Sequence, residues 1–188
     1  MDLFEKAVLF AAKAHEGKKR KIGDLPYIIH PLEVAVIAAS VTEDREVLAA
    51  CVLHDTVEDT QTTAAELEAE FGPRVAALVA SETENKMPGI PKSESWMLRK
   101  EASLEVLKNS EDIGVKILWL SDKLANMRSF FRMYVNEGAA MWQSFNQSDP
   151  AKHEYYYSKV REYTKELSHT DAWSEYSTLI DTVFKGEE

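Results

Sequence analysis

Apolar residues recur at helical spacing along nearly the whole chain, whereas the alternating pattern typical of strands is almost absent. One stripe runs through residues 4–11 and continues to His15, which we interpret as structural. A second stripe follows His30-Pro31 and comprises Leu32, Ala35, Val36 and Ala39. Proline suits the first position of a helix, where no N–H is needed. This pattern predicts an all-α fold built from amphipathic helices.

Capping and breaking residues define the further helices. Thr63-x-x-Glu66 has capping-box spacing and opens a short helix that ends at Phe71-Gly72-Pro73. Residues 84–95, "ENKMPGIPKSES", carry two prolines and a glycine, which predicts a loop and a candidate flap near a site. The other expected helices span residues 44–59, about 74–81, and roughly 95–109, 112–136, 151–168 and 173–184.

Length and composition favour one soluble globular domain. The 188 residues are 45% apolar and 29% charged, and we expect a single domain over 1–188 with a core at about 1–145. A C-terminal helical pair at about 151–184 follows the turn-forming residues Asn146 to Pro150. The single cysteine, Cys51, excludes an intrachain disulfide and fits a reducing, cytoplasmic setting.

The charge balance limits the partners. A formal charge of −10 argues against a general nucleic-acid binder, because phosphate backbones are held by net-basic surfaces. A small phosphorylated ligand remains possible where basic groups gather locally. No segment approaches the roughly 18 apolar residues of a membrane helix, and the N-terminal apolar run is too short for an export signal.

The stretch Leu53 to Thr60, "LHDTVEDT", brings polar residues directly after the apolar run Val47 to Leu53. If residues 47–59 form one helix, His54, Asp55 and Glu58 continue the stripe of Val47 and Cys51. Buried carboxylates are costly unless a cation, hydrogen bonds or a metal meet them. The alternative is a solvent-exposed helix end with charge pairs four residues apart.

Two other polar residues lie where apolar residues are expected. Asp122 falls on the face of Val115, Leu118 and Trp119 in one of the most hydrophobic helices of the chain. His30 ends the extended segment "PYIIHP" and enters a helix, although alone it would be interpreted as a capping or core histidine. Two imidazoles and two carboxylates suit a divalent first-row metal such as Mn²⁺, Fe²⁺, Co²⁺ or Zn²⁺.

Four separated motifs in the same order resemble one family. The segments "AHEGKKRKIGDLPYIIHP", "LHDTVEDT", "FGPRVAALV" and "LSDKLANMR" are similar to the hydrolase domain of the RelA/SpoT alarmone enzymes, a group of HD-domain phosphohydrolases. The similarity is strongest to the small stand-alone alarmone hydrolases, the type of the metazoan SpoT homologue. It runs from about residue 3 to residue 130.

The resemblance implies an HD-domain helical bundle with one Mn²⁺ bound by His30, His54, Asp55 and Asp122. It also implies the activity: removal of the 3′-pyrophosphate from ppGpp or pppGpp to give GDP or GTP and pyrophosphate. The chain is too short for the synthetase half of the long members, so we expect hydrolysis alone.

Glu58 and Asp59 follow the His54-Asp55 pair by one helical turn and are not needed as metal ligands. This position suits a base that takes a proton from the attacking water. By resemblance they match the catalytic Glu-Asp pair of the family. An acidic helix end is the alternative, which the helix dipole disfavours.

Basic and polar residues are expected to bind the nucleotide. "KKRK" at 18–21 is the densest basic cluster, and by resemblance its Arg20 and Lys21 contact the substrate; a solvated basic loop is the alternative. The family's asparagine four residues after the metal aspartate matches Asn126. Lys100 and Tyr155, the latter near Lys152, rest on looser similarity, and ordinary helix surface is the alternative for them.

Two departures from the family affect the substrate rather than the reaction class. Many long members have serine at the position of Ile22, with a spacing one residue shorter, and "SETENK" at 81–86 is a divergent form of their threonine-acid-lysine region. The competing hypotheses are an HD-type phosphatase for another nucleotide, such as NADPH, and a non-catalytic nucleotide-binding module.

Overall fold

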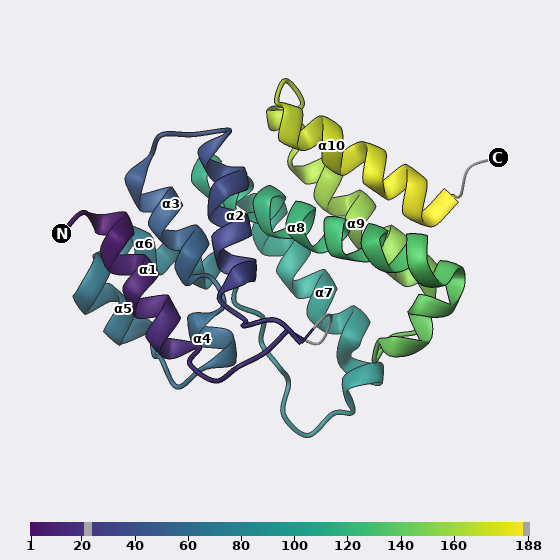
Figure 1. Cartoon of the computed structure of the whole chain (residues 1–188), viewed down its shortest axis with the longest axis horizontal. Coiled ribbons are helices and arrows are strands. Elements are labelled where there is room, and N and C mark those ends of the chain that lie inside the picture. Colours follow the sequence, from purple (N-terminus) through teal and green to yellow (C-terminus); the bar gives the residue numbers. More distant parts are fainter. Residues whose placement is uncertain (21–23, 186–188) are drawn as a thin grey trace.

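The structure is a computed structural model that describes residues 1–20 and 24–185. Helices joined by loops and turns make up its architecture (Figure 1). The first helices are α1 (Leu3–Ala14), α2 (Ile29–Ala39), α3 (Arg45–Leu53), α4 (Thr56–Asp59), α5 (Ala64–Phe71) and α6 (Pro73–Glu82). The others are α7 (Lys92–Asn109), α8 (Ile113–Glu137), η1 (Gly138–Ser144), α9 (Pro150–Tyr163), η2 (Lys165–Leu167), α10 (Asp171–Ile180) and η3 (Asp181–Lys185). Over these residues the one β-type pairing is an isolated bridge, Lys19 to Pro26. The all-α prediction is confirmed.

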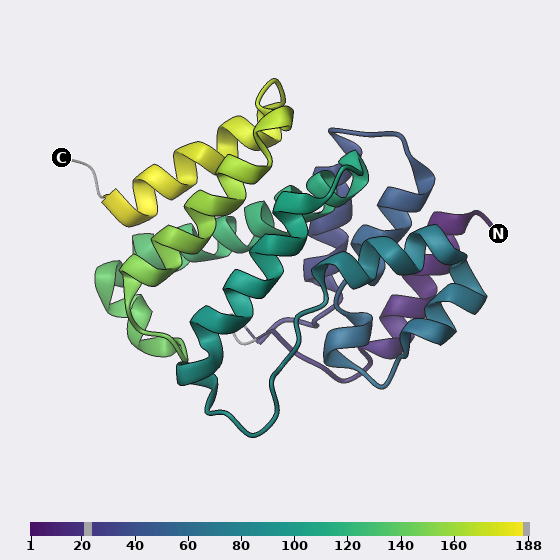
Figure 2. The same ribbon diagram turned by 180° about the vertical axis from the view of Figure 1, so that it is seen from behind.

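The long helix α8 joins two groups of helices. α2 and α3 pack on one side of α8, and α1 and α6 also pack against α3. α9 and α10 pack against α8 as well, and Lys116 near its start donates to the carbonyl of Tyr163 at the end of α9 (Figure 2). α1 and the end of α10 lie at opposite ends of the molecule (Figure 1).

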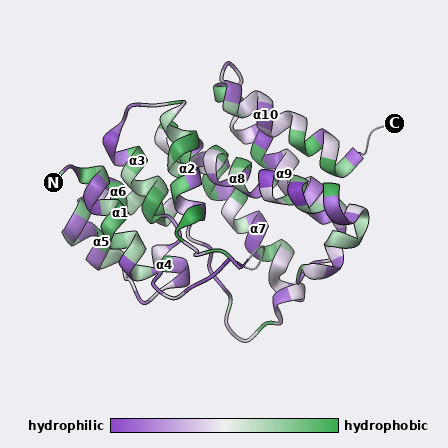
Figure 3. Ribbon diagram, viewed as in Figure 1, coloured by the Kyte–Doolittle hydropathy of each residue, from purple (hydrophilic) through white to green (hydrophobic). Residues whose placement is uncertain are grey.

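Apolar residues concentrate where these helices cross. Hydropathy colouring shows α2 hydrophobic over much of its length (Figure 3). Leu118, Trp119 and Leu120 on α8 are at most 1% exposed. Cys51 is fully buried in α3, where burial raises the pKa of its thiol, so it is the core residue that the sequence predicts. Across residues 1–20 and 24–185, no helix combines the length and apolar character that a bilayer crossing requires.

The buried face of α2 differs from the prediction. Val36, assigned to the apolar stripe, is 71% exposed, whereas Val34, Ile37 and Ala38 are buried. The helix is apolar nearly all round, so periodicity alone does not select one face. The one charged residue after Pro31 in this helix, Glu33, was not considered when the stripe was assigned, and it pairs with Arg128 on α8.

The helix expected over residues 44–59 is interrupted. It divides into α3, which ends at Leu53, and the single turn α4, with His54 and Asp55 between them. The His54 ring donates from Nδ1 to the carbonyl of Cys51 at 2.8 Å, and the Thr56 hydroxyl donates to the carbonyl of Leu53 at 2.6 Å. These side chains compete for carbonyl groups that a continuing helix would use.

The remaining boundaries follow the sequence closely. The Thr63–Glu66 capping box is present, but the loop predicted over 84–95 ends at Pro91, and α7 begins at Lys92. The helix expected at 151–168 stops at Tyr163, and residues 165–167 form the short 3-10 helix η2. The division into a core and an appended helical pair stays a prediction.

Candidate active site

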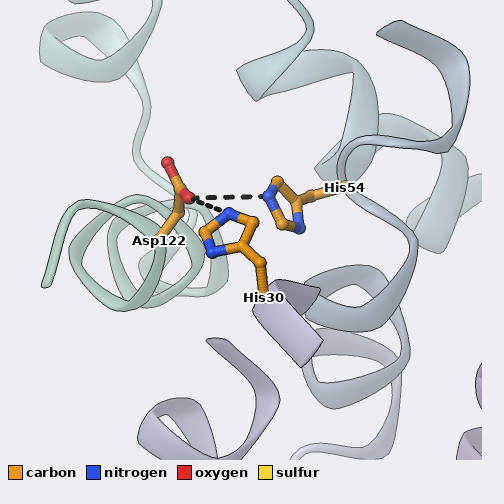
Figure 4. A group of neighbouring side chains, drawn as sticks. All are labelled: His30, His54 and Asp122. Carbon is orange, nitrogen blue, oxygen red and sulfur yellow. Dashed lines mark ion pairs between the residues drawn. The ribbon is translucent and has the colours of Figure 1, made fainter. Parts of the chain in front are cut away.

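Three helices bring the candidate metal ligands together. His30 lies in the first turn of α2, His54 follows the last residue of α3, and Asp122 lies midway along α8 (Figure 4). Asp122 Oδ1 is 2.9 Å from His30 Nε2 and 3.5 Å from His54 Nε2. All three residues are 3% exposed, and their ligand atoms lie within 4.8 Å of one another.

Asp55 completes a group of two imidazoles and two carboxylates. Its Oδ2 is 3.1 Å from His54 Nε2 and 3.7 Å from His30 Nε2. Ligand atoms about 2.1 Å from one ion are separated from each other by roughly 3 to 3.5 Å. The separations between imidazole nitrogens and carboxylate oxygens therefore suit a shared ion. His30, His54 and Asp122 have ligand atoms that all lie within 4.8 Å of one another, and Asp55 lies outside that closest group.

The chemistry of these groups also fits a metal ion. Because the Nδ1–H of His54 donates to the carbonyl of Cys51, the lone pair of its neutral form is on Nε2. That Nε2 is buried without a hydrogen-bond partner among the described residues, and it faces both carboxylates. Burial opposes a charge on His54, but the carboxylates of Asp55 and Asp122 hold its pKa well above 6.5. A positive charge is therefore favoured between the carboxylates of Asp55 and Asp122, and a divalent ion would supply it.

Asp122 is kept ionised by its neighbours on α8. Burial opposes its charge, but Lys123 at 2.6 Å and the two imidazoles hold the pKa of its carboxyl well below the usual range. Asn126 donates from Nδ2 to Asp122 Oδ1 at 3.0 Å. Lys123 also pairs with Glu82 at 2.7 Å, and burial raises the pKa of Glu82 to about 8 despite that lysine. These contacts fix the direction of the Asp122 carboxylate.

The acid pair of α4 is held by the loop over residues 83–91. Lys86 donates to the carbonyl of Glu58 at 2.6 Å and to the Asp59 carboxylate at 3.0 Å. The N–H of Glu84 donates to Glu58 Oε2 at 3.2 Å. Burial, and then the charges of Asp55 and Asp59, raise the pKa of Glu58. A carboxylate with a raised pKa at a cavity wall is suited to accept a proton near neutral pH.

Two connected cavities open at these residues. The smaller, about 380 Å³, is lined by the four candidate ligands together with Glu58 and Asp59. The larger, about 870 Å³, extends past Lys18 and Lys19 toward Trp96, Phe145 and His153. Both are lined by Arg20, Tyr27, Asp59, Lys100 and Asn126. A ligand can therefore place one end among the carboxylates and its body beside cations and aromatic rings.

The predicted substrate residues are distributed unevenly around these cavities. Arg20, Lys100 and Asn126 line both of them. Tyr155 is 40% exposed on the outer side of α9 and lines neither, whereas the next residue, Tyr156, is buried and lines the smaller one. The offset arises because successive residues of a helix point about 100° apart. Lys21 and Ile22 lie outside the described residues.

Several residues at the site were not assigned from the sequence. They are Tyr27, Glu82, Glu84, Lys86 and Tyr156. Glu82 continues the stripe of Val75, Leu78 and Val79, so it carries the same signal of an acid on a buried face that identified Asp122. The loop residues Glu84 and Lys86 have no periodic signal.

The comparison with protein families is decisive for the class. The family model described as "HD domain" matches residues 7–146, so the chain belongs to the HD-domain family. The family resemblance seen in the sequence is thereby confirmed.

Curated proteins with similar sequences show which HD-domain proteins the chain resembles. The chain is 42% identical over 127 residues to the guanosine-3′,5′-bis(diphosphate) 3′-pyrophosphohydrolase of Aquifex aeolicus and 38% identical over 127 residues to the GTP pyrophosphokinase rsh of Brucella melitensis. Each match covers 68% of this chain but only 18% and 17% of those proteins. The chain thus corresponds to less than a fifth of the curated relatives that it matches.

Two solved structures match over nearly their whole length. Lmo0812 from Listeria monocytogenes EGD-e has a TM-score of 0.72 and 33% identity, and the match covers 83% of this chain and 99% of that one. A metazoan orthologue of SpoT that hydrolyses ppGpp has a TM-score of 0.73 and 26% identity, with 98% and 95% covered.

Proposed function

We propose that this protein hydrolyses the 3′-pyrophosphate ester of ppGpp or pppGpp, giving GDP or GTP and pyrophosphate. The observation that carries the proposal is the pair of cavities that share part of their lining, one with two imidazoles and six carboxylates, the other with lysines and arginines. Such a site combines groups that can activate water with groups that bind a polyanion. The names of the Aquifex and metazoan relatives support this particular nucleotide.

His30, His54, Asp55 and Asp122 would hold one divalent ion, and we propose Mn²⁺. The imidazole nitrogens lie 2.9 to 3.7 Å from the carboxylate oxygens, and the two carboxylates would neutralise the charge of the ion. Imidazole and carboxylate ligands suit Mn²⁺ among other divalent metals, and thiolate is absent from this group. When bound, the ion supplies Lewis acidity toward the phosphate and lowers the pKa of the attacking water.

Glu58 would accept the proton of that water. Its raised pKa makes it a stronger base than an ordinary glutamate, and the Glu84 N–H fixes the direction of its carboxylate. Asp59, which accepts a hydrogen bond from Lys86, would help to orient the water. In this proposal the four ligands bind the metal, and the two acids Glu58 and Asp59 act on the water.

Cations at the junction of the cavities would bind the phosphates. Arg20 and Lys100 line both cavities, and Lys18 and Lys19 line the larger one. Asn126, bonded to Asp122, would contact the substrate or the water. We retain Lys21 as a proposed contact from the family resemblance, and we transfer the role expected of Tyr155 to Tyr156, whose ring lies 4.9 Å from Lys100 Nζ.

Incubation of the purified protein with Mn²⁺ and ppGpp tests the proposal. We expect GDP and pyrophosphate in equal amounts, detected by ion-exchange chromatography and a pyrophosphate-specific coupled assay. A parallel reaction with NADPH controls for the rival phosphatase activity. Rapid release of inorganic phosphate from NADPH without turnover of ppGpp would refute the proposal, and loss of neither substrate would favour a non-catalytic module.

A further inference from the structure

The hydroxyl of Tyr27 lies between two carboxylates that have different tasks in the proposed reaction. It donates to Asp55 Oδ2 at 2.6 Å and lies 3.2 Å from Asp59 Oδ2. Asp55 is a candidate metal ligand, whereas Asp59 belongs to the acid pair. A single side chain therefore contacts both the metal-binding group and the group that handles water.

The oxygen that Tyr27 contacts on Asp55 is the one that faces the metal position. The same Oδ2 is 3.1 Å from His54 Nε2 and 3.7 Å from His30 Nε2. A hydrogen bond to this oxygen fixes the rotation of the carboxylate and so its direction toward the two imidazoles. The distance of 2.6 Å is that of a short bond between a hydroxyl and a carboxylate.

One hydroxyl has one proton, so it cannot donate fully to two carboxylates at once. The distances show that Asp55 accepts the shorter hydrogen bond, at 2.6 Å, and that Asp59 lies at the edge of hydrogen-bonding range, at 3.2 Å. Asp59 also receives a hydrogen bond from Lys86 at 3.0 Å. Tyr27 and Lys86 thus hold different oxygens, Oδ2 and Oδ1, of the same carboxylate.

The ring of Tyr27 is itself fixed in place. It stacks on the buried His15, with ring centroids 4.7 Å apart and planes inclined by 29°. The guanidinium of Arg20 lies over the ring at 5.8 Å. Packing of the ring therefore orients the hydroxyl, and the ring and the hydroxyl can be tested separately.

We propose that Tyr27 is a positioning residue whose hydroxyl sets the geometry of both Asp55 and Asp59, an inference that rests in part on the proposed function. Removing a partner that orients a metal ligand lowers metal affinity or activity by about 10-fold to 100-fold in metalloenzymes. Tyr27→Phe keeps the ring and its stacking but removes the hydroxyl. We expect its Kd for Mn²⁺ to rise by about 10-fold or more.

The first experiment measures Mn²⁺ binding to the full chain without nucleotide, by electron paramagnetic resonance of the free ion. Tyr163→Phe, at the end of α9 and outside the lining of either cavity, removes the same atom as a matched control. Circular dichroism shows whether each variant is folded. Unchanged Mn²⁺ affinity in a folded Tyr27→Phe variant overturns the proposal, whatever the substrate of the enzyme proves to be.

The second experiment tests the contact with Asp59 through ppGpp turnover at saturating Mn²⁺. Tyr27→Phe is expected to lower kcat by about 10-fold with KM changed less than about twofold, and to have little further effect in an Asp59→Asn background. An equal loss of kcat in both backgrounds contradicts the role of Asp59.

A Tyr27→Leu variant separates the hydroxyl from the ring. If packing alone matters, Tyr27→Phe resembles the native protein while Tyr27→Leu is impaired, and the proposal fails. If the hydroxyl matters, the two variants lose similar Mn²⁺ affinity. Absence of ppGpp turnover by the native protein would refute the proposed function but would leave the Mn²⁺ measurements as a test of Tyr27.

Discussion

Replacing Glu58 with glutamine removes a proton acceptor while leaving most of its contacts in place. The amide oxygen can still accept the N–H of Glu84, now at 3.2 Å from Oε2, and Lys86 still donates to the backbone carbonyl of residue 58. The contact that is lost is the longer ion pair of Lys86 Nζ with Glu58 Oε1, at 3.8 Å. We therefore expect the loop over 83–91 to keep its position. The four candidate metal ligands are unchanged, so Mn²⁺ affinity should stay within about twofold of the native value.

The expected loss follows from what remains at the site. Removal of a general base typically lowers kcat by about 10² to 10⁴. Asp59 is the nearest replacement, but it is already engaged by Lys86 at 3.0 Å and lies 3.2 Å from the Tyr27 hydroxyl. We expect a loss of about 1,000-fold, which corresponds to about 4 kcal/mol in the activation free energy.

The pH profile gives an independent check. Burial, and then Asp55 and Asp59, raise the pKa of Glu58, and the base works only when deprotonated. The native kcat/KM should therefore rise with pH along a limb above the ordinary glutamate range, and Glu58→Gln should lack that limb. Pyrophosphate release from ppGpp provides the rates, with Glu68→Gln on exposed α5 as the control. A parallel loss of Mn²⁺ affinity, or activity within tenfold of native, would refute the assignment of Glu58 as the base.

Three further predictions concern the metal, the substrate and the core. His54→Ala should lose Mn²⁺ affinity by at least about 100-fold and lose activity with it, because it removes a ligand atom; titration with Mn²⁺ checks this, and retained affinity would contradict it. Burial and neighbouring cations lower the pKa of Lys100 to about 8, so its charge is present below that pH and lost above it. For ppGpp, kcat/KM should fall as pH rises through about 8, and Lys100→Arg should flatten this limb; an unchanged profile would exclude Lys100 from phosphate binding. Leu118→Ala, at a fully buried position, should lower the free energy of unfolding by about 2 to 5 kcal/mol in urea denaturation, and a change under about 1 kcal/mol would contradict tight packing there.

Acids on apolar faces were informative in the sequence because burying a carboxylate is costly unless something compensates it. Asp122 could be selected in this way, whereas His30 alone fitted a capping or core histidine and was selected with the help of the family resemblance. The structure brings Asp122 within 3.5 Å of His54 and His30 within 3.7 Å of Asp55. Which face of a helix is buried could be predicted only where polar residues occupied the opposite face. On α2, which is apolar nearly all round, the predicted stripe included Val36, which is 71% exposed, and left out Ala38, which is fully buried.

The contacts that complete the site depend on tertiary structure. Lys86 reaches Asp59 across 27 positions of sequence, and Tyr27 reaches Asp55 across 28. No periodicity links such pairs, since they depend on where a loop crosses a helix. The break at His54 has a local cause, because its ring and the Thr56 hydroxyl take backbone carbonyls, but the strength of that competition depends on burial of both side chains.

The candidate ligands come from α2, α8 and the junction of α3 with α4, so the complete group exists only in the folded chain. An ion that binds the folded state alone stabilises it in proportion to the logarithm of its concentration over Kd, by about 2.7 kcal/mol at 100 times Kd. Melting temperature therefore becomes a measure of metal preference. A thermal-shift series over divalent cations would rank their affinities without any nucleotide, and the order obtained would not depend on which substrate the enzyme uses.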